Sequence, residues 1–351
     1  MRENVKSMSK LTNIFKDFTS GDGVATRMKE YDRRYGGATR GGAVEHKTDY
    51  RNAGTFVNRY YDLVTDLYEY GWGQSFHFAS RAHDESFAAS ITRHEHYIAL
   101  KLGLRPGMVV VDLGCGIGGP AREIARFSGA SILGVNNNDH QLTRAVKQTE
   151  NAHMTNLVDY LKCDFMNVSL PDASFDAGYS IEGTCCAPDK VGVYSEAFRL
   201  LKSGGYLAVY ENCLTEQFDA KNPRHLQLQA DIEYGGGLSF LPLTHEVDDA
   251  MRQVGFEIVE SRDIAATAPP GIPWYEPLVG SGLSFATFRS SAVGRRITSS
   301  LLWLFERFRI VPQGSAQVSV MLNLIADTFA EAGRLGIFSP MYFILARKPT
   351  G

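Results

Sequence analysis

Short apolar runs alternate with longer amphipathic stretches between residues 108 and 262 of this chain. The apolar runs predict buried strands, and the stretches with apolar residues at helical spacing predict helices. The expected strands cover residues 108–113, 131–135, 157–162, 175–180, 205–211 and 256–262, and the expected helices cover residues 119–128, 139–151, 189–202, 224–234 and 244–254. This alternation is typical of an α/β fold, in which helices cover both faces of a parallel sheet.

The segment before this alternation has a different pattern. Residues 1–55 are rich in glycine and charged residues, which predicts a flexible N-terminal arm with room for one helix. Apolar residues then recur at helical spacing from Phe87 to Leu102, and Asp84 is placed to act as the N-cap of that helix.

The segment after the alternation begins with a proline-rich loop. It then predicts two helices, over residues 295–308 and 315–333, and a final buried strand over residues 341–347 that returns to the sheet. The chain is thereby divided into an arm (1–55), a main domain (56–262) and a C-terminal domain (263–351).

Composition agrees with an ordinary soluble globular protein, since 44% of the 351 residues are hydrophobic and 21% are charged. A net charge of −3 gives no reason to expect a nucleic-acid partner. The five cysteines lack metal-ligand spacing, so we expect free thiols and no metal site. No apolar run is long enough to cross a membrane.

A glycine-rich turn follows the first strand of the alternation. Asp112 ends the strand, and Gly114, Gly116 and Gly119 have the spacing of dinucleotide-binding turns, in which a ligand touches the backbone. A carboxylate at the mouth of this turn would repel a pyrophosphate and attract an ammonium group. This disfavours a nicotinamide cofactor, although the glycine spacing alone does not exclude it.

Two later strands end in polar residues at the same edge of the expected sheet. Asn136 ends the second strand, and its amide can hydrogen-bond a ribose. Asp164 and Phe165 follow the third strand, where they could accept an adenine amine and cover the adenine ring. S-adenosylmethionine carries an ammonium group, a sulfonium and a ribose but no phosphate, so it fits this set better than a dinucleotide. Glu182 ends the fourth strand at the same edge.

An aromatic segment, residues 68–78, precedes the alternation. Gly71 and Gly73 interrupt it, which predicts an ordered loop whose rings line an apolar cavity and could stabilise a cation. Glu69 among these rings is either a salt-bridged structural acid or a functional one.

Several segments together closely resemble the sterol 24-C-methyltransferase family. The likeness runs from about residue 50 to the C-terminus, and its segments are residues 68–78, 93–97, 112–120, 134–139, 179–188, 272–278 and 338–341. The aromatic motif is highly specific, whereas many methyltransferases share the glycine motif. The resemblance implies a class I methyltransferase with a Rossmann-like sheet flanked by helices and a C-terminal sterol-methyltransferase helical segment.

The resemblance also implies a reaction. The double bond of a Δ24 sterol side chain attacks the methyl group of S-adenosylmethionine, and the cation left at carbon 25 undergoes a hydride shift and loses a proton. This step of ergosterol-type biosynthesis needs an apolar slot, ring faces near the cation and a base.

The resemblance assigns roles to individual residues. The catalytic candidates are Glu69, Tyr70, His94 and Glu182, the sterol-binding candidates are Tyr68, Trp72, Phe76 and Phe78, and the cofactor-binding candidates are Asp112, Gly114, Gly116, Gly118, Asn136, Gln141, Asp164 and Phe165. The sequence leaves open which of Glu69, His94 and Glu182 accepts the proton.

Because a sterol is dissolved in lipid, we expect peripheral contact with the cytoplasmic face of the endoplasmic reticulum. The apolar stretch 301–305 is a candidate contact surface, with core packing or oligomer packing as the alternative. We also expect a homo-oligomer.

The chain departs from the family pattern at three positions. The family usually has Ala at Gly183, His at Cys186 and Trp at Asn212. A neutral thiol is a poorer base than imidazole. Two alternatives therefore stay open, a non-catalytic or altered-specificity paralogue that binds sterol and S-adenosylmethionine, and a methyltransferase of another isoprenoid lipid.

Overall fold

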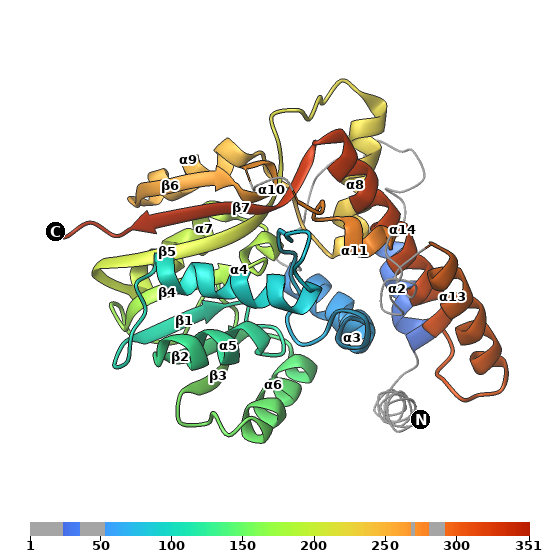
Figure 1. Ribbon diagram of the computed structural model, residues 1–351, viewed down its shortest axis with the longest axis horizontal. Helices are drawn as coiled ribbons and strands as arrows, with labels where there is room; N and C mark the ends of the chain where they lie inside the picture. Colours follow the sequence, from blue (N-terminus) through green and yellow to red (C-terminus); the bar gives the residue numbers. More distant parts are fainter. Residues whose placement is uncertain (1–23, 36–52, 268–270, 281–291) are drawn as a thin grey trace.

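The fold is built around one seven-stranded sheet, flanked by helices on both faces (Figure 1). The computed structural model describes residues 24–35, 53–267, 271–280 and 292–351. The strands are β1 (Val109–Leu113), β2 (Ser131–Asn136), β3 (Val158–Lys162), β4 (Phe175–Ile181), β5 (Leu201–Leu214), β6 (Glu257–Asp263) and β7 (Phe338–Arg347). Their order in the sheet is β3-β2-β1-β4-β5-β7-β6. The expected α/β fold is therefore confirmed.

The expectation of an entirely parallel sheet is wrong for the last strand. β7 lies between β5 and β6 and is antiparallel to both. The reason is the position of α14 (Ser315–Leu335), which lies beyond the carboxyl ends of the parallel strands (Figure 1). The chain leaves α14 and begins β7 at Phe338, so β7 has to run back in the opposite direction.

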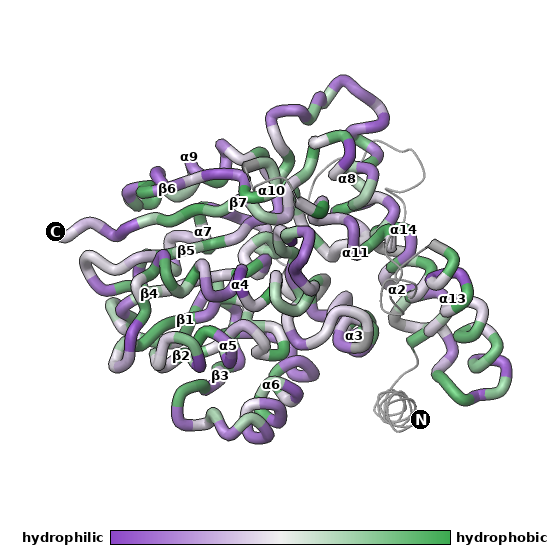
Figure 2. Tube along the Cα trace, in the orientation of Figure 1, coloured by the Kyte–Doolittle hydropathy of each residue, from purple (hydrophilic) through white to green (hydrophobic). Residues whose placement is uncertain are grey.

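Side chains of alternate residues pack into two cores, one on each face of the sheet. On β1, Val110 packs in the core beneath α4 (Phe87–Lys101) and α5 (Gly119–Ser128), and Val111 packs in the core beneath α7 (Lys190–Leu200) and α9 (Thr244–Val254). Figure 2 shows mostly hydrophobic residues along β7 and mixed hydropathy along β5 and on outer helices such as α6 (Asp139–Asn151). The sheet is stabilised by apolar burial on both sides.

A separate group of helices lies beyond the carboxyl edge of the sheet. Its members are α2 (Val24–Tyr35), α3 (Ala53–Trp72), α8 (Pro223–Gly236), α11 (Glu276–Val279), α13 (Ala292–Arg307) and α14, and the short α10 (Ile264–Thr267) follows β6. Buried side chains of α8 and α14 form a core with Phe78 and Trp274. These helices enclose the space above the strand ends.

The described part of the N-terminal arm is more ordered than we expected. In α2 the side chains of Val24, Met28 and Tyr31 are buried, and they pack in one cluster with residues of α3 and α14. The remainder of the arm, residues 1–23 and 36–52, lies outside the described residues. The domain boundaries themselves stay a prediction.

Two local expectations were wrong. The aromatic segment does not begin as a loop, because α3 continues through Gly71 and ends at Trp72. Gly73, with a φ of +103°, follows it. The N-cap of α4 is Ser86, whose side chain accepts a hydrogen bond from Ala89 N, and not Asp84. In the described residues, no helix is both long and apolar enough to cross a bilayer.

Candidate functional site

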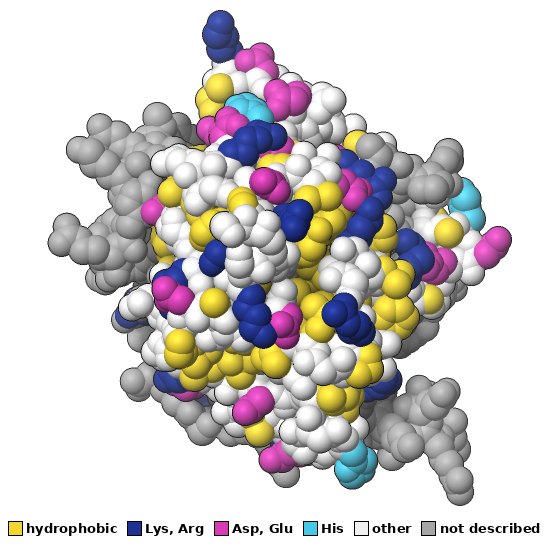
Figure 3. All heavy atoms as spheres, turned by 90° about the vertical axis from the view of Figure 1, so that its left-hand side faces the viewer, with side chains coloured by type: hydrophobic (Ala, Val, Ile, Leu, Met, Phe, Trp, Pro, Cys, Tyr) yellow, Lys and Arg dark blue, Asp and Glu magenta, His cyan; other side chains and the backbone are white. Residues whose placement is uncertain are grey.

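Two adjoining cavities lie at the carboxyl ends of the parallel strands. The turn cavity is lined by the glycine turn after β1, the end of β2 and residues 164–166, and the aromatic cavity by rings of α3, residues 76–78 and α14. The turn cavity has a volume of about 940 Å³ and the aromatic cavity about 770 Å³, and both volumes include the solvent at the mouth. Figure 3 shows the side of the molecule where β7 ends, on which basic, acidic and hydrophobic side chains are mixed.

The glycine turn presents its backbone to the turn cavity. Gly114 has a φ of +87°, and a Cβ on it would lie 2.9 Å from Gly183 Cα. Gly116 has a φ of +54°, and a Cβ there would meet nothing within 4 Å, because it borders open space. The amides of Gly114 and Cys115 both donate to Val135 O, which fixes the turn against β2. Only glycine combines this backbone shape with such a close approach.

The next two glycines accommodate neighbouring protein and do not line either cavity. A Cβ on Gly118 would lie 2.1 Å from Tyr160 Oη, and one on Gly119 would lie 2.0 Å from Gln74 O. The segment after α3 therefore rests directly on the start of α5. The expectation that Gly118 contacts the cofactor is not supported, since this residue serves packing.

Asp112 does not face the mouth of the turn. It is 2% exposed, it lines neither cavity, and it accepts a hydrogen bond from Tyr179 Oη at 3.1 Å. Burial raises its pKa to about 7, although the Tyr179 hydrogen bond lowers it. The expected orientation toward the mouth of the turn is therefore wrong, and a role of this carboxylate in binding an ammonium group stays a prediction.

Polar groups at the end of β2 form one wall of the turn cavity. Asn136 Nδ2 donates to Gly116 O at 3.3 Å and to Gln141 Oε1 at 2.8 Å. Gln141 Nε2 in turn donates to Thr65 Oγ1 of α3 at 3.2 Å. Gln141 therefore holds Asn136 in place as well as lining the cavity, and Asn137 lines it too, which the sequence did not single out.

Asp164 and Phe165 line the same cavity. Asp164 Oδ1 accepts a hydrogen bond from Met166 N at 2.9 Å, which shapes the turn after β3. A Cβ on Gly54 would lie 3.5 Å from Asn137 Nδ2 and 4.0 Å from Asp164 Oδ2, so the start of α3 lies close above these residues. Asp164 and Phe165 therefore follow β3, as the sequence indicated, and line the turn cavity.

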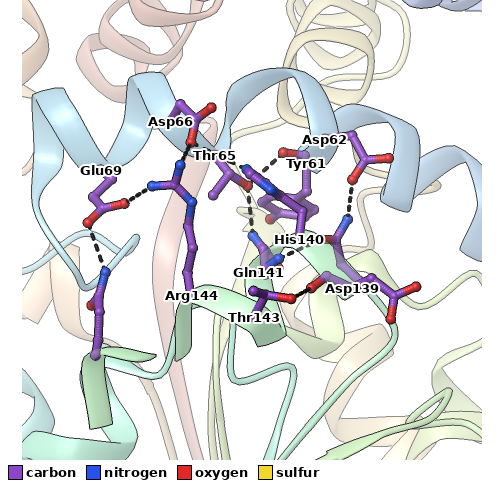
Figure 4. A network of polar contacts seen from close by, with 12 residues as sticks. Tyr61, Asp62, Thr65, Asp66, Glu69, Asp139, His140, Gln141, Thr143 and Arg144 are labelled. Carbon is purple, nitrogen blue, oxygen red and sulfur yellow. Dashed lines mark hydrogen bonds and ion pairs between the residues drawn. The ribbon is translucent and has the colours of Figure 1, made fainter. Parts of the chain in front are cut away.

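A network of polar contacts joins α3 to α6 (Figure 4). Arg144 of α6 is ion-paired with both Asp66 and Glu69 of α3, and Gln148 Nε2 donates to Glu69 Oε1 at 2.8 Å. His140 Nε2 lies 3.3 Å from Asp66 Oδ1. Glu69 therefore faces α6 and lines neither cavity, so the structure supports the salt-bridged role and not a catalytic one.

The four rings predicted to bind the sterol all line the aromatic cavity, and they are Tyr68, Trp72, Phe76 and Phe78. Phe78 makes edge contacts with Trp72 at 5.2 Å and with Trp274 at 5.0 Å between ring centroids. Ile325 and Phe329 of α14 close the cavity from the C-terminal side. The side chain of Tyr70 lies outside the described residues.

Four residues line both cavities and form the junction between them, and they are Tyr61, Phe76, His77 and Glu182. Glu182 has a φ of +52°, a strained conformation for a residue with a side chain. Its Oε1 accepts a hydrogen bond from Phe78 N at 2.7 Å. Burial raises its pKa to about 7, with a smaller opposing effect from the charge of His77. The junction thus carries a carboxylate able to exchange a proton near neutral pH.

His77 is a site residue that the sequence reasoning did not select, although it lies in the aromatic motif. Its Nδ1 donates to Phe78 O at 2.9 Å, and its Nε2 lies 3.1 Å from Glu95 Oε1. Burial lowers the pKa of His77, but the hydrogen bond and charge of Glu95 outweigh this effect and leave the pKa raised. The protonated form of the imidazole beside Glu182 is thereby favoured.

His94 does not reach either cavity. Its ring stacks on Tyr210 with centroids 3.7 Å apart and on His77 at 5.3 Å, and the residue is 3% exposed. Burial holds its pKa well below the ordinary range. His94 is therefore a neutral ring beneath the site, and the structure does not support it as the proton acceptor.

The three departures from the family pattern cluster at the junction. Gly183 and Cys186 line the turn cavity, whereas Asn212 lines the aromatic cavity. A Cβ on Gly183 would lie 2.5 Å from Leu113 O, so this residue is closely packed. Lys190 and Thr184 anchor this segment to the fully buried Glu211.

The comparisons with known proteins agree with this geometry. A methyltransferase domain model matches residues 111–209, and a sterol methyltransferase C-terminal model matches residues 285–350. The chain is 46% identical to the cycloartenol-C-24-methyltransferase of Arabidopsis thaliana, over 93% of this chain and 95% of that protein. It is 41% identical to the sterol 24-C-methyltransferase of Saccharomyces cerevisiae, over 92% and 85%.

Solved structures support the same fold. The cyclopropane synthase MmaA2 of Mycobacterium tuberculosis is similar with a TM-score of 0.66 at 16% identity, covering 84% of this chain and 96% of that one. A geranyl diphosphate methyltransferase is similar with a TM-score of 0.62 at 17% identity, covering 84% and 98%. The C-terminal model matches this chain, and relatives that are 41% to 46% identical cover more than nine-tenths of it. The chain therefore belongs to the sterol 24-C-methyltransferase family.

Proposed function

We propose that this enzyme transfers the methyl group of S-adenosylmethionine to carbon 24 of a Δ24 sterol in ergosterol-type biosynthesis. The observation that carries this proposal is the junction at which Tyr61, Phe76, His77 and Glu182 line both cavities. A donor in one cavity and an acceptor in the other meet only there. Curated relatives that span most of the chain are named as sterol 24-C-methyltransferases.

The turn cavity fits S-adenosylmethionine. The open space beside Gly116 leaves room for a ligand against the backbone, and Asn136 Oδ1 can accept a hydrogen bond from a ribose hydroxyl, since its Nδ2 hydrogens are already used. Asp164 can accept the adenine amine, and Phe165 can cover the ring. When bound, the donor supplies an electrophilic methyl group on its sulfonium.

The aromatic cavity fits the reacting tail of the sterol. Its apolar walls exclude water, and the faces of Trp72 and Phe76 can stabilise a developing cation at carbon 25. Above its pKa of about 7, Glu182 is a carboxylate and can accept the proton that the cation loses. His77 holds the backbone of Phe78, which itself donates to Glu182.

Methyl transfer from labelled donor to a panel of Δ24 sterols tests this proposal. Formation of a 24-methylated product is expected. If the protein binds S-adenosylhomocysteine but methylates no sterol, the non-catalytic paralogue is the correct reading, and product from another isoprenoid alkene alone would establish that lipid as the acceptor. A Cys186→His variant with raised turnover would locate any defect at this departure.

We also propose that α13 contacts the cytoplasmic face of the endoplasmic reticulum. Within the stretch 301–305, Leu302 is buried, whereas Leu301 is 45%, Trp303 63% and Leu304 41% exposed. Exposed apolar side chains of this kind bind lipid interfaces. Replacing Trp303 and Leu304 with serine should weaken binding to phosphatidylcholine vesicles about tenfold, whereas Val259→Ser, at an exposed position on β6, should not. Unchanged vesicle binding would refute the contact.

A homo-oligomer is a separate proposal, which the exposed Val320 and Leu324 of α14 favour. Light scattering at micromolar concentration should give a mass above that of one chain. A monomeric mass across the range would exclude it.

A further inference from the structure

One polar atom in the wall of the aromatic cavity has no partner. Asn212, near the end of β5, lines this cavity and is 7% exposed. Its Oδ1 accepts no hydrogen bond. Among the described residues, no other residue that lines the turn cavity or the aromatic cavity has a buried side-chain nitrogen or oxygen without a partner. A buried acceptor without a donor is costly, so a ligand that supplies the donor gains affinity.

The neighbouring contacts fix which end of the amide is free. Cys185 Sγ donates to Glu182 O at 2.9 Å, so the thiol hydrogen is already used. Asn212 Nδ2 donates to the same sulfur at 3.5 Å. Because the sulfur can only accept from Asn212, the amide nitrogen points to Cys185 and the oxygen remains the unsatisfied acceptor.

Asn212 lines the cavity near its reacting end, with Oδ1 just beneath the surface of the wall. Through Cys185 it is linked to Glu182, which lies at the junction of the two cavities. The other polar groups of the wall have partners here. His77 uses both ring nitrogens, and Tyr68 Oη lies 2.6 Å from Tyr60 Oη.

We propose that Asn212 is a specificity residue that accepts a hydrogen bond from a hydroxyl group on the reacting tail of the acceptor. The preferred substrate class is then a Δ24 sterol whose terminal isoprene unit also carries a hydroxyl. The proposal rests on the proposed function, since it concerns the acceptor of that same site. The indole that the family usually carries here could donate a hydrogen bond but could not accept one.

A matched pair of ligands tests the proposal. The equilibrium affinity of a Δ24 sterol and of its 26-hydroxylated counterpart is measured with S-adenosylhomocysteine present, so that no turnover is required. The wild-type protein should bind the hydroxylated sterol about tenfold more tightly. Asn212→Leu, which is close in size and has no acceptor, should lose this preference and bind the plain sterol at least as well as the wild type does.

The control variant is Ile325→Val, which trims an apolar part of the same wall and should keep the preference. Equal affinity of the wild type for the two sterols would overturn the proposal, because Oδ1 is then satisfied by water. If Asn212→Leu does not fold, the comparison of the two sterols within the wild type and in Asn212→Ala decides, because alanine also lacks an acceptor and should lose the preference. A preserved preference without methyl transfer to either sterol would refute the proposed function and leave the subsite standing.

Discussion

Replacing Glu182 with glutamine separates the chemical role of the junction from its structural role. The amide oxygen can still accept the hydrogen bond from Phe78 N, so the local geometry is retained. The variant cannot accept a proton, and loss of a general base typically lowers the rate by about 10² to 10⁴. We expect kcat to fall within that range, with the affinity for S-adenosylhomocysteine unchanged. In the wild type, kcat/KM should rise as the pH passes through about 7.

The same substitution should alter the pH dependence of stability. The pKa of Glu182 rises from an ordinary value of 4.5 to about 7 on folding, which corresponds to at most about 3 kcal/mol. Because the folded state binds this proton more tightly, the wild type loses stability as the pH rises from 4.5 to 7. Glu182→Gln avoids this loss, so it should be more stable than the wild type above pH 7 and similar to it well below 4.5.

Urea unfolding at about pH 4 and pH 8 measures this difference. Glu257→Gln, at an exposed position on β6, is the matched control and should follow the wild type at both pH values. The reasoning is refuted if Glu182→Gln keeps both the wild-type pH dependence and a kcat within tenfold of the wild-type value.

Two further substitutions test the packing around the site. Gly119→Ala should lower the free energy of unfolding by about 1–3 kcal/mol and weaken S-adenosylhomocysteine binding, because the new Cβ would collide with Gln74 O. Gly71→Ala, with open space around it in α3, should instead raise the free energy of unfolding by about 0.5–1 kcal/mol. Urea unfolding compares the stability of the two variants, and calorimetry compares their binding of S-adenosylhomocysteine. Glu69→Gln should lower the free energy of unfolding by about 1–3 kcal/mol through loss of the Arg144 ion pair. Its kcat should stay near the wild-type value, and a hundredfold loss in a kinetic assay would restore Glu69 as a catalytic candidate.

The strands and helices of the main domain were predictable because central strands such as β1 contain an apolar run and the helices between the strands are amphipathic. The expected strand 131–135, for example, is β2 (Ser131–Asn136), and the expected helix 139–151 has the observed bounds. The direction of β7 was not predictable, since it depends on where α14 lies in space. The continuation of α3 through Gly71 was missed because packing of Trp72 outweighs the modest helix penalty of one glycine.

The site was predictable to the level of the strand ends but not to the level of side-chain direction. Glu182, Asn136 and Asp164 line the turn cavity as the sequence indicated. Asp112 does not, because the register of β1 and β4 pairs it with Tyr179, whose hydroxyl then holds the carboxylate inside the sheet layer. Side-chain direction at a strand end depends on such neighbours, which local sequence does not contain.

The most direct test of the account is the product formed from a Δ24 sterol and S-adenosylmethionine that carries a deuterated methyl group. Mass spectrometry and NMR of the purified sterol should place the labelled carbon at position 24, and Glu182→Gln should form far less of this product. An unlabelled sterol, recovered from protein that binds S-adenosylhomocysteine normally, would contradict the account.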